Sequence, residues 1–303
     1  MFIRIAGGPP VNYFPFSQGF PQRSRAAAGA DMNESDGRAN VQLDGVTLRF
    51  GGVTALENVC LDIRGGELLA LIGPNGAGKT SVLNCISGLY RPTEGTIALR
   101  DPEGGSHALH RLHPHRIARL GVARTFQSIE LFKHMTALDN IMLGRHVHMR
   151  GGVLSGGLFW GLQRRREIRH RVRVEGVIDF LNLEPVRHAI VGNLPYGQQK
   201  LVELGRALAL DPEILLLDEP MAGMNSEEKE SMARFILDVH EEWGATPVVI
   251  DHDMDVIMDI SERVVVLEFG QVIAEGPPAE VRADARVIEA YLGHGETAAG
   301  AAS

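Results

Sequence analysis

The sequence predicts an α/β fold with a largely parallel sheet and an inserted block of helices. An apolar run of strand length, residues 68–72, leads directly into a glycine-rich loop and then into a helical pattern. Further apolar runs of strand length recur after residue 213, and helical stretches separate the first three of them. Strands that alternate with helices are typical of a parallel sheet. Between about residues 129 and 192 the pattern is helical, which predicts the inserted block.

The elements follow in order along the chain. Alternating apolar residues predict strands at 41–48 and 56–63, before the buried strand at 68–72. Helical spacing then runs from Val82 to Leu89 and reappears from Val174 to Leu181. Four more strands are expected at 214–217, 247–250, 264–267 and 271–274.

Composition limits the function classes. Of the 303 residues, 44% are hydrophobic and 22% are charged, so a wholly disordered chain is excluded. The net charge of −8 argues against a dedicated nucleic-acid-binding protein, which usually carries a basic domain. No apolar stretch reaches the roughly 18 to 20 residues that span a bilayer, so at a membrane another chain must do the crossing. Cys60 and Cys85 form no CxxC pair, which fits a reducing compartment, and both are expected to be small core residues.

The two ends of the chain differ from the middle. Residues 1–30 contain no Asp or Glu and are rich in Gly, Pro, Ala, Ser and Gln. Residues 1–40 are therefore expected to be a disordered extension, with Met32 as the true start; a transit peptide is the alternative. One folded domain is expected at 41–293, followed by a flexible tail at 294–303.

The glycine-rich loop has the pattern Gly-x4-Gly-Lys-Thr, which is typical of a phosphate-binding P-loop. Glycines allow the backbone to wrap closely and to point its N–H groups at phosphate oxygens, and the following helix adds the positive end of its dipole. Lys79 can reach the β- and γ-phosphates, and Thr80 is the usual Mg²⁺ ligand of this pattern. A simple glycine-rich turn is the alternative. The expected nucleotide-binding residues here are Gly73, Pro74, Asn75, Gly76, Ala77, Gly78, Lys79, Thr80 and Ser81.

Two acidic residues, Asp218 and Glu219, directly follow the strand expected at 214–217. A buried strand would deliver Asp218 rigidly beside the P-loop, where it can hold Mg²⁺. Glu219 would then stand where it can polarise an attacking water. An ordinary acidic turn after a strand is the alternative, and the P-loop upstream disfavours it.

The order of these motifs resembles the nucleotide-binding subunits of ATP-binding cassette (ABC) transporters, over about residues 41–293. Residues 73–80 correspond to Walker A, 214–219 to Walker B, and 194–198 (Leu-Pro-Tyr-Gly-Gln) to the family's signature sequence. Gln127 and His252 stand at the positions of the Q-loop glutamine and the switch histidine, and residues 222–225 resemble the D-loop. The resemblance implies a P-loop NTPase fold: a RecA-like core sheet, an antiparallel β-subdomain and an inserted α-helical signature subdomain at about 129–200.

The resemblance also implies roles for individual residues. Gln127 would contact Mg²⁺ or the attacking water, and His252 would hydrogen-bond the γ-phosphate and help to hold Glu219 and the water in line. Phe50 stands where the family has the aromatic that stacks on adenine. Metal ligands would be Thr80, Gln127 and Asp218.

The signature sequence departs from the family's commonest form. Pro195 replaces the usual serine and supplies neither a hydroxyl nor an N–H, and Tyr196 replaces a glycine. Backbone groups of Tyr196, Gly197 and Gln198 at a helix start would still contact the nucleotide of a partner subunit. The missing hydroxyl contact puts the hydrolysis rate in question, and not the fold.

The amino-acid sequences of several motifs resemble those of one branch of the family, whose members energise uptake of branched-chain and other hydrophobic amino acids. These motifs are Leu-Pro-Tyr-Gly-Gln-Gln at 194–199, Ala-Arg-Thr-Phe-Gln at 123–127 and Tyr-Leu-Gly at 291–293. The resemblance implies ATP and Mg²⁺ as cofactors and a peripheral place on the cytoplasmic face of the inner membrane. Implied partners are a second ABC ATPase subunit, alike or different, paired head to tail, two transmembrane permease subunits and, indirectly, a solute-binding protein, with no nucleic acid.

Three other functions remain open at this point. An exporter or lipid-extraction ATPase would share every catalytic residue and differ in its partners. A soluble ABC ATPase acting on DNA or the ribosome usually carries two cassettes or long coiled-coil insertions, whereas this chain has one P-loop. A small-molecule kinase would leave Gln127, the signature sequence and His252 unexplained.

Overall fold

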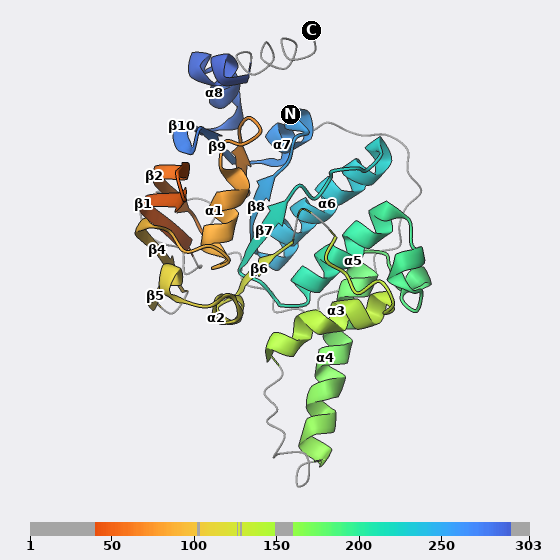
Figure 1. Ribbon diagram of the computed structural model, residues 1–303. Helices are drawn as coiled ribbons and strands as arrows, with labels where there is room; N and C mark the ends of the chain where they lie inside the picture. The colour runs from red at the N-terminus through yellow and green to blue at the C-terminus, as the bar shows by residue number, and fades with distance from the viewer. Residues whose placement is uncertain (1–39, 102–103, 126, 128, 149–159, 292–303) are drawn as a thin grey trace, which may run out of the picture.

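The computed structural model describes residues 40–101, 104–125, 127, 129–148 and 160–291, and these form two sheets flanked by helices (Figure 1). The expectations for residues 1–39 and for the tail after Tyr291 lie outside the described residues.

The first sheet is antiparallel, with strand order β2-β1-β4-β5. It confirms the antiparallel β-subdomain that the family resemblance implies. Strands β1 and β2 match the two expected strands, whereas β4 and β5 follow from no apolar run, since only Ile97 and Leu99 of β4 are buried. The bounds are β1 Asn40–Phe50, β2 Val53–Ile63, β4 Glu94–Arg100 and β5 Ser106–Ala108.

The second sheet forms the centre of the molecule, with order β10-β9-β3-β8-β7-β6. All its pairings are parallel except that of β9 with β10, which confirms the predicted parallel sheet. Strand β6 was not expected, because three residues are too few to show a period. The bounds are β3 Leu69–Ile72, β6 Val122–Arg124, β7 Ile214–Asp218, β8 Thr246–Ile250, β9 Arg263–Glu268 and β10 Gln271–Gly276.

The helices divide into two groups. Helix α1 (Lys79–Ile86) connects β3 to β4 of the antiparallel sheet, and α6 (Ser226–Trp243) and α7 (Met254–Ile260) connect strands of the central sheet. Helices α3 (Ala137–Arg145), α4 (Trp160–Phe180) and α5 (Tyr196–Leu208) lie between β6 and β7, on the side away from the antiparallel sheet, and α4 projects from the body (Figure 1). The remaining short helices are α2 (Pro114–Arg119), α8 (Pro278–Ala283) and the 3-10 turns Leu109–Arg111, His146–His148, Glu184–Val186 and Val191–Asn193.

The central strands separate two hydrophobic cores. Residues such as Ile72 and Leu217 face the core shared with α3–α7, and their neighbours Leu71 and Leu216 face the core shared with α1 and the antiparallel sheet. This division follows from the alternation of side chains along a strand. Because both faces are covered, β3 and β7 are fully buried and hold the loops at their ends rigidly.

The two cysteines differ in burial. Cys85 is buried in α1, as expected, but Cys60 is exposed, so its assignment to the core was wrong. In β2 the buried positions around it are Val59, Leu61 and Ile63, and a strand turns every second side chain to the opposite face.

Among the helices that the structure describes, none combines the length and apolar character needed to cross a membrane.

Candidate functional site

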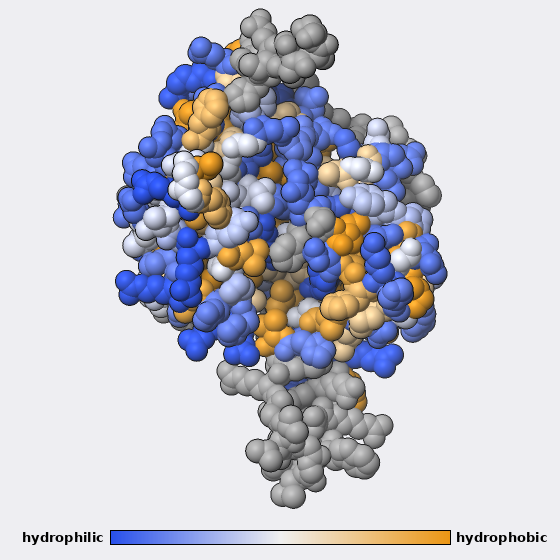
Figure 2. Space-filling model, viewed as in Figure 1, coloured by the Kyte–Doolittle hydropathy of each residue, from blue (hydrophilic) through white to orange (hydrophobic). Residues whose placement is uncertain are grey.

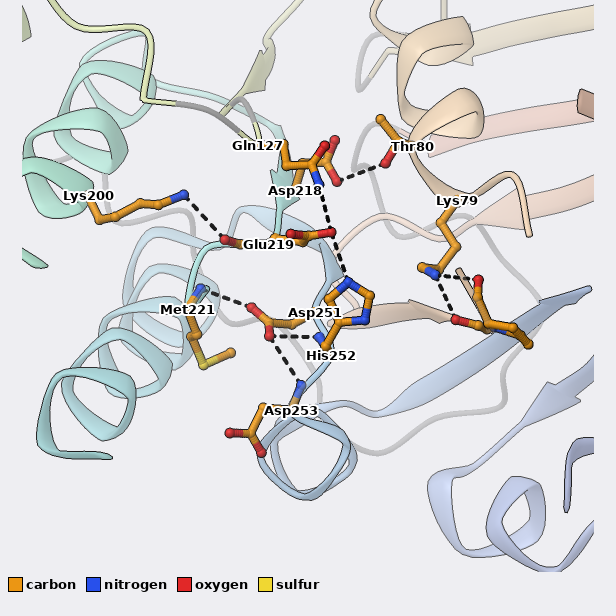
Figure 3. A network of polar contacts seen from close by, with 12 residues as sticks. Lys79, Thr80, Gln127, Lys200, Asp218, Glu219, Met221, Asp251, His252 and Asp253 are labelled. Atoms are coloured by element: carbon orange, nitrogen blue, oxygen red, sulfur yellow. Dashed lines mark hydrogen bonds and ion pairs between the residues drawn. The ribbon is translucent and has the colours of Figure 1, made fainter. Parts of the chain in front are cut away.

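Three loops meet at one edge of the central sheet, following β3, β7 and β8. These strands are parallel neighbours, with β8 paired to both β3 and β7, so their carboxyl ends lie together. Side chains from these loops converge in Figure 3, and Gln127 joins them from the segment after β6. Ligands of open α/β sheets bind at this kind of edge.

The loop after β3 has the backbone of a phosphate-binding cradle. Gly73, Gly76 and Gly78 have φ angles of 145°, 81° and 102°, which other residues rarely adopt. A Cβ on Gly78 would also lie 2.8 Å from the carbonyl oxygen of Ala55. Helix α1 begins at the next residue, so the free N–H groups of its first turn face the loop and form an anion site.

Lys79 places an ammonium group on this loop. Its Nζ donates hydrogen bonds to the carbonyl oxygens of Gly73, at 2.6 Å, and Pro74, at 3.0 Å. Burial lowers the pKa of Lys79, and the nearby carboxylates of Glu219 and Asp218 oppose that effect. The backbone N–H groups of the loop would bind phosphate oxygens, and the Lys79 ammonium group is held close enough to contact the same oxygens.

Asp218 lies at the end of β7, fully buried. Its Oδ1 accepts a hydrogen bond from Oγ1 of Thr80 at 3.2 Å, so two of the three residues expected to hold Mg²⁺ are in contact. Its Oδ2 accepts from Nη2 of Arg124 at 3.0 Å, and Arg124 also donates to Oδ1 of Asn84 at 2.6 Å. Burial raises the pKa of Asp218, and the Arg124 guanidinium opposes this rise. Carboxylate and hydroxyl oxygens are the donors that Mg²⁺ prefers, so this pair fits the ion.

Arg124 was missed as a site residue by the sequence analysis. The available signal was an arginine at the end of an apolar segment, three residues before Gln127. A buried guanidinium needs a buried anion, and Asp218 on the neighbouring strand β7 is that anion.

Two of the predicted site residues, Gln127 and His252, make hydrogen bonds to one carboxylate oxygen of Glu219. Its Oε1 accepts a hydrogen bond from Nε2 of Gln127 at 3.0 Å and lies 2.9 Å from Nε2 of His252 (Figure 3). Since a carboxylate only accepts, Nε2 of His252 is the donor. The structure thus brings together Gln127, Glu219 and His252, which come from three separate segments.

The backbone of Glu219 is strained. Its φ is 51°, in the left-handed region, and Pro220 follows it. Such a conformation costs on the order of 1–3 kcal/mol for a residue other than glycine, and persists where surrounding contacts fix it. One such contact is the 2.7 Å hydrogen bond from its N–H to the carbonyl oxygen of Ile250.

Asp251 is a second residue that the sequence analysis missed. It is buried and accepts hydrogen bonds from the backbone N–H groups of Met221 at 2.9 Å, His252 at 2.8 Å and Asp253 at 3.2 Å. It therefore ties the loop after Glu219 to the loop that carries His252 (Figure 3). A carboxylate directly after the buried strand β8 was the signal for it.

The signature sequence begins α5, as expected, with Pro195 at the N-cap and no side-chain cap. The first-turn N–H groups of the helix, which include those of Gly197 and Gln198, are of the kind that binds anions. A Cβ on Gly197 would overlap Oε1 of Glu228, which forms a capping box with Asn225 at the start of α6. The signature sequence is thus packed on the end of the loop that starts at Glu219.

Phe50 lies at the turn between β1 and β2 with 47% of its surface exposed. Its ring meets that of Tyr90 edge to face, with centroids 5.1 Å apart. Ala55, in the same hairpin, lies against Gly78 of the loop. The hairpin therefore flanks the phosphate site and leaves the Phe50 ring open to a ligand.

Comparison with known proteins agrees with this geometry. Residues 56–222 match the ABC transporter family, and residues 271–297 match the C-terminal segment of the branched-chain amino acid ATP-binding cassette transporter. The high-affinity branched-chain amino acid transport ATP-binding protein LivG of Salmonella typhimurium is 40% identical over 83% of this chain and 96% of its own length. The corresponding protein BraF of Pseudomonas aeruginosa is 39% identical over 84% of this chain and 98% of its own length.

Solved structures give the same result. A nucleotide-free ATP-binding cassette from an ABC transporter superposes with a TM-score of 0.71 at 28% identity, over 84% of this chain and 98% of that one. A dimeric cassette in a post-hydrolysis state, bound to ADP and Pi, superposes with a TM-score of 0.66 at 30% identity, over 78% of this chain and 98% of that one. The expected fold class and the expected branch are confirmed: the chain belongs to the ABC transporter family, as an ATP-binding subunit with the C-terminal segment of the branched-chain amino acid branch.

Proposed function

We propose that this chain binds and hydrolyses ATP to drive an importer for branched-chain amino acids or related small hydrophobic or amide solutes. It would work at the cytoplasmic face of the inner membrane with a second ATPase subunit, two permease subunits and, indirectly, a solute-binding protein. The similarity to LivG and BraF, which are branched-chain amino acid transport ATP-binding proteins, and the match at residues 271–297 support the solute class. The observation that carries the proposal is the meeting of Gln127 and His252 at one carboxylate oxygen of Glu219, beside the P-loop.

In this account the P-loop and Lys79 bind the phosphates of ATP, and Phe50 stacks on the adenine. Thr80, Asp218 and the amide oxygen of Gln127 would hold Mg²⁺, which neutralises phosphate charge when bound.

Hydrolysis is assigned to the residues around Glu219. Its carboxylate accepts a proton from the attacking water and so makes the oxygen more nucleophilic. His252 donates a hydrogen bond from Nε2, which can orient either the carboxylate or a γ-phosphate oxygen. His252 can direct this N–H to a γ-phosphate oxygen only if its contact with Oε1 of Glu219 is exchanged.

The signature sequence would act on the nucleotide of the partner ATPase. Gly197 and Gln198 would offer backbone N–H groups at the start of α5, and Pro195 offers no hydroxyl. Closure of the pair around two ATP molecules would switch the permeases, and hydrolysis would reset them.

Hydrophobic side chains lie along the side of the molecule that carries α3–α5 and in the middle of the face in Figure 2. Phe132, which lies between β6 and α3 on the side of the helices α3–α5, is exposed and would offer a permease subunit an apolar contact.

The test is a pull-down of tagged Glu219→Gln protein from native membranes in the presence of ATP, with the copurifying chains identified. Two multi-span permeases, a second ATPase and a solute-binding protein are expected, and the bound solute can then be screened. Permeases without a solute-binding protein would favour an exporter. Ribosomal or DNA-associated proteins without permeases would contradict transport.

A further inference from the structure

A buried lysine of the signature helix contacts the backbone of Glu219. Lys200 lies in α5, one turn after Tyr196, and is 3% exposed. Its Nζ donates a hydrogen bond to the carbonyl oxygen of Glu219 at 3.3 Å. In Figure 3 Lys200 reaches this carbonyl from α5, while Gln127 and His252 reach the side chain. Glu219 is therefore held at its backbone and at its carboxylate by different elements.

The strained conformation of Glu219 explains why its backbone needs such contacts. With φ at 51°, the peptide groups on both sides are turned away from the course of β7. The N–H on one side is fixed by Ile250, and the C=O on the other side is fixed by Lys200. Since the backbone angles set the direction of the Cα–Cβ bond, these two hydrogen bonds also set where the carboxylate points.

The surroundings of Lys200 favour its hydrogen bond to the Glu219 carbonyl oxygen. A buried ammonium is costly unless polar partners surround it. Besides the Glu219 carbonyl, the Tyr196 ring lies 6.0 Å from Nζ, at the limit of a cation–π contact. Tyr196 also packs on the loop after Glu219, because a Cβ on Gly223 would lie 3.0 Å from its ring. Two residues of α5 thus contact both ends of the segment 219–223.

We propose that Lys200 is a positioning residue that couples the signature helix to Glu219. The start of α5 would contact the partner's nucleotide, and Lys200 would transmit its position to the peptide that orients the carboxylate. This inference rests on the proposed role of Glu219 in hydrolysis. It assigns Lys200 no contact with ATP.

The test compares Lys200→Met with wild type, both assembled with the partner subunits that copurify with them. Methionine keeps an unbranched apolar stem of similar length and removes the donor. We expect kcat for ATP hydrolysis to fall about tenfold, while KM for ATP and the melting temperature stay near wild type. Lys200→Arg, which restores a donor, should recover part of the rate. Lys200→Leu, which is apolar and also lacks a donor, carries the same expectation as Lys200→Met and replaces it if that variant does not fold.

Lys229→Met is the matched control. Lys229 lies next to the same group of loops and donates a hydrogen bond to Oδ2 of Asp253 at 2.7 Å. Among the contacts that the described residues make, none joins Lys229 to Glu219. This variant should keep kcat within twofold of wild type. On a Glu219→Gln background, Lys200→Met should cause no further loss, because two changes that act through one carboxylate are not additive.

The outcomes separate this inference from the proposed function. If Glu219→Gln abolishes hydrolysis but Lys200→Met turns over at the wild-type rate, the positioning role is overturned and the proposed function stands. A joint loss of kcat, ATP affinity and melting temperature in Lys200→Met and Lys200→Leu would assign Lys200 to the packing of α5 and also overturn the positioning role. If Glu219→Gln itself hydrolyses ATP normally, the proposed function fails first.

Discussion

Nε2 of His252 lies 2.9 Å from Oε1 of Glu219, across the gap between the loops that follow β8 and β7. The two residues are 33 positions apart in the chain, and the hydrogen bond that Asp251 accepts from the backbone N–H of Met221 ties their loops together. Contacts within the protein itself therefore orient the carboxylate. In the proposed mechanism, ATP and water exchange into contacts that the protein has already prepared.

Phe50→Ala should weaken ATP binding about tenfold, since stacking of a base on an aromatic ring contributes roughly 1–3 kcal/mol. The ring is 47% exposed, so the melting temperature should change little. Equilibrium titration with a fluorescent ATP analogue measures the effect. Phe132→Ala, at another exposed phenylalanine on the side of α3–α5, is the control and should bind as wild type does. Equal affinities for Phe50→Ala and wild type would remove Phe50 from the nucleotide site.

Arg124→Met should lower the free energy of unfolding by about 3–5 kcal/mol, because it leaves the buried Asp218 carboxylate without its cation. Urea unfolding measures the loss. Adding Asp218→Asn should recover part of it, since the unpaired charge is then removed. Arg286→Met, which breaks an exposed pair with Asp284, serves as the control and should unfold near the wild-type midpoint. A double variant less stable than Arg124→Met would contradict the charge argument.

How far the sequence predicts this structure depends on the kind of contact. Strands β3, β7 and β9 are fully or almost fully buried, so uninterrupted apolar runs identified them. Strands β5 and β6 have three residues each and form only because neighbouring strands pair with them. No local pattern can show such pairing.

The same distinction holds within the site. Lys79, Asp218 and Glu219 stand in local motifs whose spacing the phosphate chemistry requires, and the structure places them together. Arg124 and Lys200 act through contacts with segments 94 and 19 residues away, which depend on strand register and helix packing. No local sequence pattern predicts these two contacts.

The two thiols should differ sharply in reactivity. Burial raises the pKa of Cys85 to about 12, so almost no thiolate forms at pH 8, and the side chain is also inaccessible. Cys60 is exposed on β2. Iodoacetamide at pH 8, followed by peptide mass spectrometry, should modify Cys60 and leave Cys85 free until urea unfolds the protein. Early modification of Cys85 in the folded protein would show that α1 opens far more readily than its burial implies.

The most direct measurement of the central claim is a parallel determination of ATP affinity and ATP turnover for wild type and Glu219→Gln, each with its copurifying partner subunits. Glutamine keeps the shape of the side chain and removes its capacity to accept a proton. The account predicts ATP affinity within about twofold of wild type and turnover reduced at least about 100-fold. Glu227→Gln, at an exposed acid in the first turn of α6, should behave as wild type. Wild-type turnover by Glu219→Gln would contradict the assignment of Glu219 as the group that activates water.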